Sequence, residues 1–435
     1  MSFTHRSCIA LVVAALFMAL AAPAWCADAP AKPAIEILQP AADAVLEGVI
    51  EVRARVTPDT ESASALYVGF NAAPWYPMSR VEKTNEWTCK INTSLSANGL
   101  ATLQVFGRTA SVKKLSQSVK VELQNGYSAY IGDFHGHTYY SDGTLLPADA
   151  HKYARETAKL DFFVLMDHLE SMDEAEWADY RQQAWKANED GKFACFPGLE
   201  WTKGLGHACL YDPPTRVWPK DKDGFFQAVV DAGIFCKINH PGDGKRVFDG
   251  LAYSEVGDKA VELMEVRNAN EEAAYIRALQ LGWHLSADGS SDTHSPNWGN
   301  TNTWTGVIAP GKSQRNLWDA LKSRHTYSTH DRNCKLFFWI NGTQMGDIIE
   351  QPALQVRAEV LVSDPDAQDT IAKIELYEDG AVVQTAEPKA TEYRWQTLAD
   401  PQPGNHFYFV RVTQTDGQMM WSAPVWVTTV TAPTQ

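Results

Sequence analysis

The feature that most constrains the fold of this chain is a series of seven short apolar runs between residues 126 and 332. They span 129–137, 161–168, 193–201, 206–211, 234–241, 260–266 and 284–294. Amphipathic segments of helical spacing, such as 173–190 and 271–282, lie between them. Because the runs are apolar on both faces, they resemble strands of a parallel sheet covered by helices. The sequence therefore predicts an α/β fold whose βα units form a TIM-like barrel.

The regions on either side of this segment have a different pattern. Residues 30–125 and 333–435 contain runs in which apolar and polar residues alternate, broken by Gly, Asn, Pro or Ser. Alternation with a period of two and frequent turn signals is typical of small β-sandwiches. We therefore expect an Ig-like N-terminal β-sandwich over 30–125, a barrel over 126–332 and a C-terminal β-sandwich over 333–435.

The N-terminal 29 residues have the composition of a cleavable signal peptide. An apolar run over 9–22 follows Arg6, and small residues lead to Ala29. This run is too short to span a bilayer, and no later run reaches about 18 apolar residues, so we expect a periplasmic or secreted protein without a membrane span. A net charge of −15 disfavours general nucleic-acid binding. The five cysteines after the leader are odd in number and without CxxC spacing, which favours free, buried thiols.

Metal-binding side chains recur at the ends of the apolar runs. His135 and His137 are two residues apart on the first run and should point to the same face. Imidazole and carboxylate ligands suit Zn, Mn or Fe, and nine ligands exceed what one ion can use. The sequence therefore predicts two to three divalent transition-metal ions. The nine candidate ligands are His135, His137, Asp142, His168, Glu200, His207, His240, Asp292 and His294.

Three acidic residues are the candidates for catalytic roles: Glu200, Asp292 and Asp167. Glu200 lies between the histidine clusters in sequence and could bridge two ions. Asp167 precedes His168 and should face the opposite side of its strand, so we expect it to orient a ligand. For Glu265, a position inside the site and a purely structural hydrogen bond are both compatible with the sequence.

The order of these motifs resembles that of the polymerase-and-histidinol-phosphatase (PHP) family of metallohydrolases. The matching pieces are DFHGHTYYSDG at 133–143, LMDH at 165–168, GLE at 198–200, GH at 206–207, NHP at 239–241 and SDTH at 291–294. The tail, with YSTHDRN and WINGTQMGD, looks like the secreted carbaryl-hydrolase-like (CehA/McbA) branch. The resemblance implies a seven-stranded distorted β/α barrel with a trinuclear metal site.

The same resemblance implies a division of the ligands among three ions. His135, His137, Glu200 and Asp292 would hold the first ion, and Glu200 would also hold the second with His207 and His240. Asp142, His168 and His294 would hold the third. Asp142 stands where some family members have a histidine, which leaves the identity of the third metal open.

Together, the ligand count and the resemblance predict a secreted metal-dependent hydrolase of small-molecule esters. The first expectation is a phosphoesterase acting on a mono- or diester through a metal-bridging hydroxide. A carboxylic ester or carbamate hydrolase with the same metals is the alternative within this class. The alternative from another class is a non-catalytic envelope-binding protein, whose flanking β modules dock on envelope or glycan. The sequence has no Walker, GxGxxG or GxSxG motif, so metal is the only cofactor expected.

Overall fold

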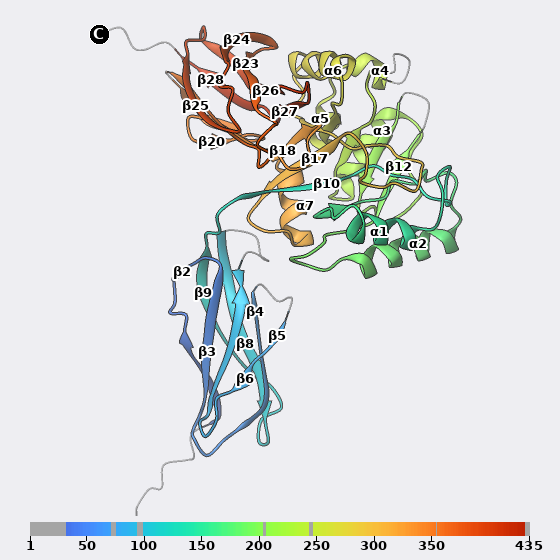
Figure 1. Cartoon of the computed structure of the whole chain (residues 1–435). Helices are drawn as coiled ribbons and strands as arrows, with labels where there is room; N and C mark the ends of the chain where they lie inside the picture. The colour runs from blue at the N-terminus through green and yellow to red at the C-terminus, as the bar shows by residue number, and fades with distance from the viewer. Residues whose placement is uncertain are drawn as a thin grey trace, which may run out of the picture.

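The structure, a computed structural model, describes residues 32–70, 75–93, 99–202, 206–242, 247–353 and 355–430. The expected signal peptide at 1–29 lies outside these residues. Strands dominate the described part of the chain, with 28 strands against seven helices (Figure 1). None of the described helices is both long and apolar enough to cross a membrane.

The first module is a sandwich of two sheets, with strand orders β1-β3-β7-β6 and β2-β9-β8-β4-β5. Along β3, Val52, Ala54 and Val56 are buried while the residues between them are more exposed, as the period-two pattern requires. Leu66 of β4 and Leu103 of β8 complete the same core from the other sheet. The strands are β1 (Ala34–Gln39), β2 (Val45–Leu46), β3 (Val49–Thr57), β4 (Ala63–Phe70), β5 (Tyr76–Pro77), β6 (Ser79–Arg80), β7 (Glu86–Asn92), β8 (Gly99–Thr109) and β9 (Leu115–Leu123).

The middle of the chain has a strand in each of the seven apolar runs and two further strands. They are β10 (Ser128–Asp133), β11 (Phe162–Phe163), β12 (Gly198–Trp201), β13 (Ala208–Tyr211), β14 (Cys236–Ile238), β15 (Val261–Glu265), β16 (Ser286–Asp288), β17 (Trp304–Ala309) and β18 (Thr326–Thr329). The helices are α1 (Pro147–Glu156), α2 (Glu174–Ala187), α3 (Lys222–Asp231), α4 (Phe248–Leu251), α5 (Glu255–Ala260), α6 (Ala269–Gln280) and α7 (Gln314–Lys322). Both amphipathic segments singled out in the sequence form helices, α2 and α6.

The prediction of an α/β fold with a seven-stranded, parallel TIM-like barrel is wrong. The nine strands divide between two sheets, and the five-stranded sheet β12-β13-β14-β15-β16 is mixed. Its β12/β13 and β13/β14 pairs are antiparallel, and only β14/β15 and β15/β16 are parallel. The segment between Trp201 and Ala208 is too short for a crossover helix, so β12 and β13 pair as an antiparallel hairpin. Apolar runs reveal burial of a strand but not the direction of its partner.

The second sheet joins the middle of the chain to the C-terminal module. It has ten strands, eight of them in the order β11-β10-β17-β18-β27-β26-β23-β24, with β28 pairing with β26 and β21. Tyr327 of β18 pairs with Ser422 of β27, so this sheet runs across the boundary expected between residues 332 and 333 (Figure 1). A four-stranded sheet, β20-β19-β22-β25, belongs to the C-terminal module.

The C-terminal strands pack into the same core as the middle of the chain. Buried Leu336 of β19, Val360 of β22 and Trp421 of β27 belong to one hydrophobic cluster with Leu210 of β13 and Tyr275 of α6. The strands are β19 (Lys335–Ile340), β20 (Thr343–Gln344), β21 (Ile348–Ala353), β22 (Val356–Ser363), β23 (Ile371–Glu378), β24 (Ala381–Ala386), β25 (Glu392–Ala399), β26 (Gly404–Gln414), β27 (Met419–Ser422) and β28 (Val425–Thr429).

Candidate metal centre

The nine predicted ligands lie together at the ends of the middle strands. His135 and His137 follow β10, His168 follows β11, and His240 follows β14. Glu200 lies on β12, and His207 immediately precedes β13, whose Cys209 pairs with Glu200. Asp292 and His294 follow β16, and Asp142 lies in the turn before α1. Single parallel bridges, His168 to Glu200 and Gly136 to Thr293, bring these loops side by side.

The first group of ligand atoms surrounds the buried imidazoles that follow β10. The Nε2 atom of His135 lies 3.3 Å from an Asp292 carboxylate oxygen and 3.6 Å from a Glu200 carboxylate oxygen. The Nε2 atom of His137 lies 3.1 Å from Asp292 and 3.7 Å from Glu200. These are the four residues that the family resemblance assigns to one ion.

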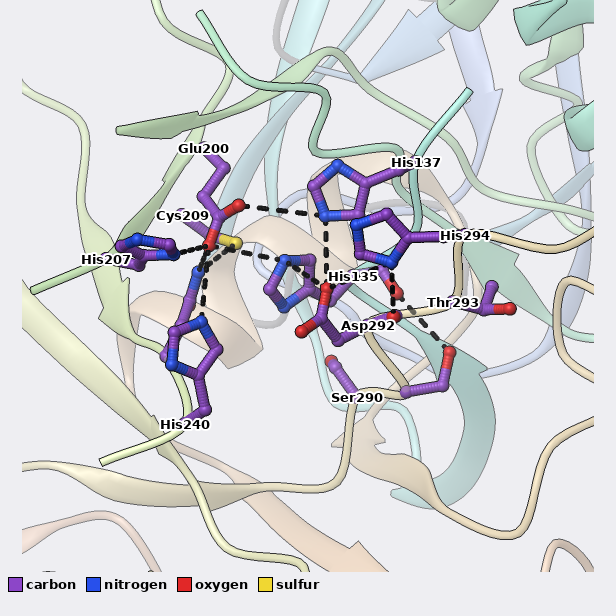
Figure 2. A network of polar contacts seen from close by, with 12 residues as sticks. His135, His137, Glu200, His207, Cys209, His240, Ser290, Asp292, Thr293 and His294 are labelled. Atoms are coloured by element: carbon purple, nitrogen blue, oxygen red, sulfur yellow. Dashed lines mark hydrogen bonds and ion pairs between the residues drawn. The ribbon is translucent and has the colours of Figure 1, made fainter. Parts of the chain in front are cut away.

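Glu200 links this group to a second one. Its Oε1 atom lies 3.2 Å from Nδ1 of His207 and 3.7 Å from Nε2 of His240. Figure 2 shows the Glu200 carboxylate with His207 and His240 on one side and His137 on the other. The carboxylate is only 1% exposed, so both of its oxygens face protein groups instead of solvent.

Asp142 is at the centre of the third group. Its carboxylate oxygens lie 3.4 Å from Nε2 of His168 and 3.2 Å from Nε2 of His294. The side chains of Asp142 and His294 are 57% and 37% exposed, whereas those of His135 and His137 are fully buried. The centre therefore opens to solvent at Asp142 and His294.

The donor atoms fit metal ions in number, chemistry and spacing. Three overlapping sets of these residues have ligand atoms that all lie within 4.8 Å of one another. The sets are His135, His137 and Glu200; Glu200, His207 and His240; and His137, Asp142, His168 and His294. Two atoms that both bind one ion at about 2.1 Å are about 3.0 to 3.4 Å apart, close to the separations seen here. The buried Nε2 of His135 and Nδ1 of His168 make no hydrogen bond, although each faces a carboxylate. Nitrogen atoms without hydrogen bonds that point at a shared carboxylate are what a metal ion would satisfy.

Electrostatics keep the carboxylates of this centre ionised. Burial alone would raise the pKa of Glu200, but the neighbouring His135 lowers this pKa well below its usual value. Burial likewise opposes ionisation of Asp292, yet His135 and His137 lower its pKa to about 2. Burial would lower the pKa of His135, whereas Asp292 and other acidic neighbours raise it well above its usual value. The site therefore favours positive charge between its carboxylates, which a bound cation would supply.

A buried acid and a buried lysine fix the orientation of His135. Glu265 accepts a hydrogen bond of 2.6 Å from Nδ1 of His135, which leaves Nε2 directed at Glu200 and Asp292. Glu265 also accepts 2.6 and 2.9 Å hydrogen bonds from the backbone N–H of His240 and from Nζ of Lys237. Of the two roles left open for Glu265, the structure shows the hydrogen-bonding one, and these hydrogen bonds orient His135 and His240.

Asp167 has a positioning role as well. Its carboxylate accepts hydrogen bonds of 2.7 Å from the backbone N–H and the hydroxyl of Thr138, and one of 2.5 Å from Ser141. These bonds hold the turn that carries Asp142. Because its oxygens face Thr138 and Ser141, we assign Asp167 to orientation of this turn and remove it from the catalytic candidates. Gly143 follows in the same turn, where a Cβ atom would come within 2.5 Å of the His137 carbonyl oxygen.

Two of the proposed ligands have unusual backbone conformations. Asp292 has a φ of 56° and His240 a φ of 28°, in the left-handed region that non-glycine residues rarely adopt. The Asp292 conformation is stabilised by the hydrogen bond of its N–H to the His135 carbonyl, 2.9 Å. Strain of this kind is concentrated at functional sites, where the surrounding structure enforces it.

Several residues of the site were not found by sequence reasoning. Lys237 and Asp288 lie fully buried in the apolar runs of β14 and β16 and form an ion pair of 3.1 Å. Asn239 donates a 2.6 Å hydrogen bond to Glu200, and Cys209 lies 3.2 Å from the same amide. Asp133 accepts hydrogen bonds from the backbone N–H groups of His135 and Ser291. A charged residue inside an otherwise apolar run is the signal that could have revealed Lys237, Asp288 and Asp133.

Comparisons with known proteins find distant similarity only. No family model matches the chain. A protein of Chlamydia muridarum is 29% identical over 140 residues, which cover 28% of this chain and 22% of the relative. A protein of Chlamydia pneumoniae is 21% identical over 394 residues, covering 77% of this chain and 63% of the relative. Both are described only as uncharacterized proteins, and the chain spans less than two thirds of the length of either one.

Solved structures resemble the chain weakly. An endo-β-1,4-mannanase from Thermotoga petrophila has a TM-score of 0.21 at 15% identity and covers 23% of this chain and 21% of its own. Fibronectin(III)-like modules of Clostridium thermocellum CbhA have a TM-score of 0.17 at 8% identity, over 92% of this chain and 98% of theirs.

Proposed function

We propose that this protein is a metal-dependent hydrolase of phosphate esters. The observation that carries the proposal is the overlap of three sets of ligand atoms, two of which share the buried Glu200 and two of which share His137. The motif order that resembles PHP metallohydrolases supports the same class of reaction. When bound, the ions would supply an ionised water at neutral pH and a positive charge for the anionic oxygens of the ester.

The residues of the chain prepare the ligand atoms before any substrate binds. Glu265 fixes the His135 ring through Nδ1, and the backbone carbonyl of Asp292 lies 3.0 Å from Nδ1 of His294. In both rings, Nε2 is therefore the nitrogen that points toward the carboxylates. Glu200, nearly fully buried, joins the first and second groups through its two oxygens. The exposed Asp142 and His294 border the opening of the centre.

The balance of charge favours an anionic substrate. The nine ligands include three carboxylates and six imidazoles, so three divalent ions would leave a surplus of positive charge in the centre. Buried acids around the ligands reduce this surplus. Glu265 and Asp288 share Lys237, and Glu265 also contacts Arg267. Asp133 and Asp167 bond to backbone N–H and hydroxyl groups. A phosphate ester carries the complementary charge, whereas a carbamate or carboxylic ester is neutral at the reacting group.

Hydrolysis assays on the full-length protein loaded with Mn, Zn or Fe test this proposal. We expect turnover of phosphate mono- or diesters, and in ¹⁸O-labelled water we expect one label in the phosphate product, because water attacks phosphorus. The matched control is His284→Gln, which changes a histidine bonded to Asp258 outside the centre and should retain full activity. Cleavage of naphthyl carbamates or carboxylic esters without any cleavage of phosphate esters would contradict the proposed substrate class.

A further inference from the structure

A buried thiol lies among the ligands of the metal centre. Cys209 is on β13, directly opposite Glu200 of β12 in an antiparallel pair, and it is fully buried. Side chains of directly opposite residues in such a pair project from the same face of the sheet. The sulfur of Cys209 and the carboxylate of Glu200 therefore face the same side, which is the side of the metal centre.

The amide of Asn239 shows that the sulfur and the carboxylate meet. Its nitrogen donates a 2.6 Å hydrogen bond to Glu200 and lies 3.2 Å from the sulfur of Cys209. Cys209 and His135 are also close enough to interact electrostatically. Figure 2 shows the sulfur between the Glu200 carboxylate and the His135 ring. The thiol thus lies beside two of the residues assigned to the first ion.

The Nε2 atom of His135 provides an independent indication of a ligand at this point. It is buried and, among the residues that the structure describes, it has no hydrogen-bond partner. With Nδ1 bonded to Glu265, Nε2 is directed at the oxygens of Glu200 and Asp292, 3.6 and 3.3 Å away. The imidazole lone pair, the carboxylates and the sulfur are all electron-pair donors, and a cation satisfies them together.

We propose that the sulfur of Cys209 is a further ligand of the ion held by His135 and Glu200, and that it makes the centre prefer zinc over manganese. The inference rests on the metal centre of the proposed hydrolase. A thiol that coordinates a cation loses its proton outright. The resulting thiolate is a soft ligand that suits zinc, whereas manganese prefers carboxylate, carbonyl and water oxygens.

Cobalt titration of the chelator-treated full-length protein tests this assignment. Cobalt(II) binds to the same nitrogen, oxygen and sulfur ligands as neighbouring first-row metals, and a thiolate bound to it gives a charge-transfer band in the near ultraviolet. The unchanged protein should develop this band as cobalt binds, and Cys209→Ser should bind cobalt without it. The matched control is Cys195→Ser, which changes a buried thiol 3.4 Å from His151, outside the centre, and should retain the band.

Two further measurements address the zinc preference. X-ray absorption at the zinc edge of the unchanged, zinc-loaded protein should show a sulfur neighbour at about 2.3 Å, and this result does not depend on the folding of any variant. In competition titrations, Cys209→Ser should lower the affinity for zinc by at least about 10-fold, the lower bound for loss of a residue that merely supports a ligand. Its affinity for manganese should change by less than about threefold.

The outcomes separate this inference from the proposed function. If cobalt binds without the band, if the band survives in Cys209→Ser, or if zinc has only nitrogen and oxygen neighbours, Cys209 is not a ligand and the proposed hydrolase is unaffected. If the unchanged protein binds neither cobalt nor zinc, both the thiolate ligand and the metal-dependent hydrolase are rejected.

Discussion

Replacing Glu200 by Gln is expected to reduce kcat/KM for a phosphate ester by at least about 10³-fold. The change keeps the shape of the side chain but removes the negative charge that two groups of ligands share. It therefore weakens binding of two ions at once, whereas loss of a residue that only orients a ligand costs about 10- to 100-fold. Steady-state kinetics at saturating metal, with circular dichroism to verify folding, measure this effect.

The control for Glu200→Gln is Glu255→Gln. Glu255 forms an exposed ion pair with Lys259 in α5, so the same chemical change there should alter kcat/KM by less than about twofold. A folded Glu200→Gln protein that retained more than about a tenth of the activity would refute a shared-ligand role for Glu200.

The largest effect on stability is expected for Lys237→Met. Lys237 is fully buried, and its ammonium group lies 2.9 Å from Glu265 and 3.1 Å from Asp288. Although burial alone would lower the pKa of Lys237, Asp288 and Glu265 raise it well above its usual value, so the ammonium is charged. Removing it leaves two buried carboxylates with less compensation, which costs about 3 to 5 kcal/mol. Arg267, 3.2 Å from Glu265, offsets part of this cost.

Lys237→Met should also affect the metal centre, because Glu265 orients His135. We expect metal affinity to fall by about 10- to 100-fold, in addition to the lower stability in urea. Lys259→Met, which breaks only an exposed pair, should change the unfolding free energy by less than about 0.5 kcal/mol. If Lys237→Met were as stable as Lys259→Met, the buried network would not support the centre as described.

The sequence located the strands of the middle region well but not their arrangement. Each apolar run contains a strand because burial on both faces leaves a local signal. The partners of a strand leave no such signal: β12 and β13 pair antiparallel, and β18 pairs with the distant β27. The sheet that continues past residue 332 is formed by contacts between segments that are distant in the sequence. The change in composition near residue 332 suggests a domain boundary there and so hides this continuity.

Most of the candidate ligands could be proposed from the sequence because they interrupt an apolar run at its end, where side chains of different strands converge. Asp142, in the turn before α1, and His207, just before β13, are the exceptions. His135 and His137 share a face through their spacing alone, and both lie against Asp292. The residues that support the ligands were harder to find. Lys237 and Asp288 form an ion pair between two different strands, and the sequence of either strand alone does not reveal this pairing. For Asp167, the sequence predicted an orienting role but not the residues that it bonds, Thr138 and Ser141.

Metal analysis of the chain tests the central claim most directly. Protein purified without chelator and supplied with Mn, Zn or Fe should contain two to three transition-metal ions per chain by elemental analysis, because nine ligands in three groups exceed the needs of one ion. The double variant His135→Ala/His137→Ala should contain at least one ion fewer, while the N-terminal β-sandwich stays folded. A content below one ion per chain in the unchanged protein, after supplementation with all three metals, would contradict the account.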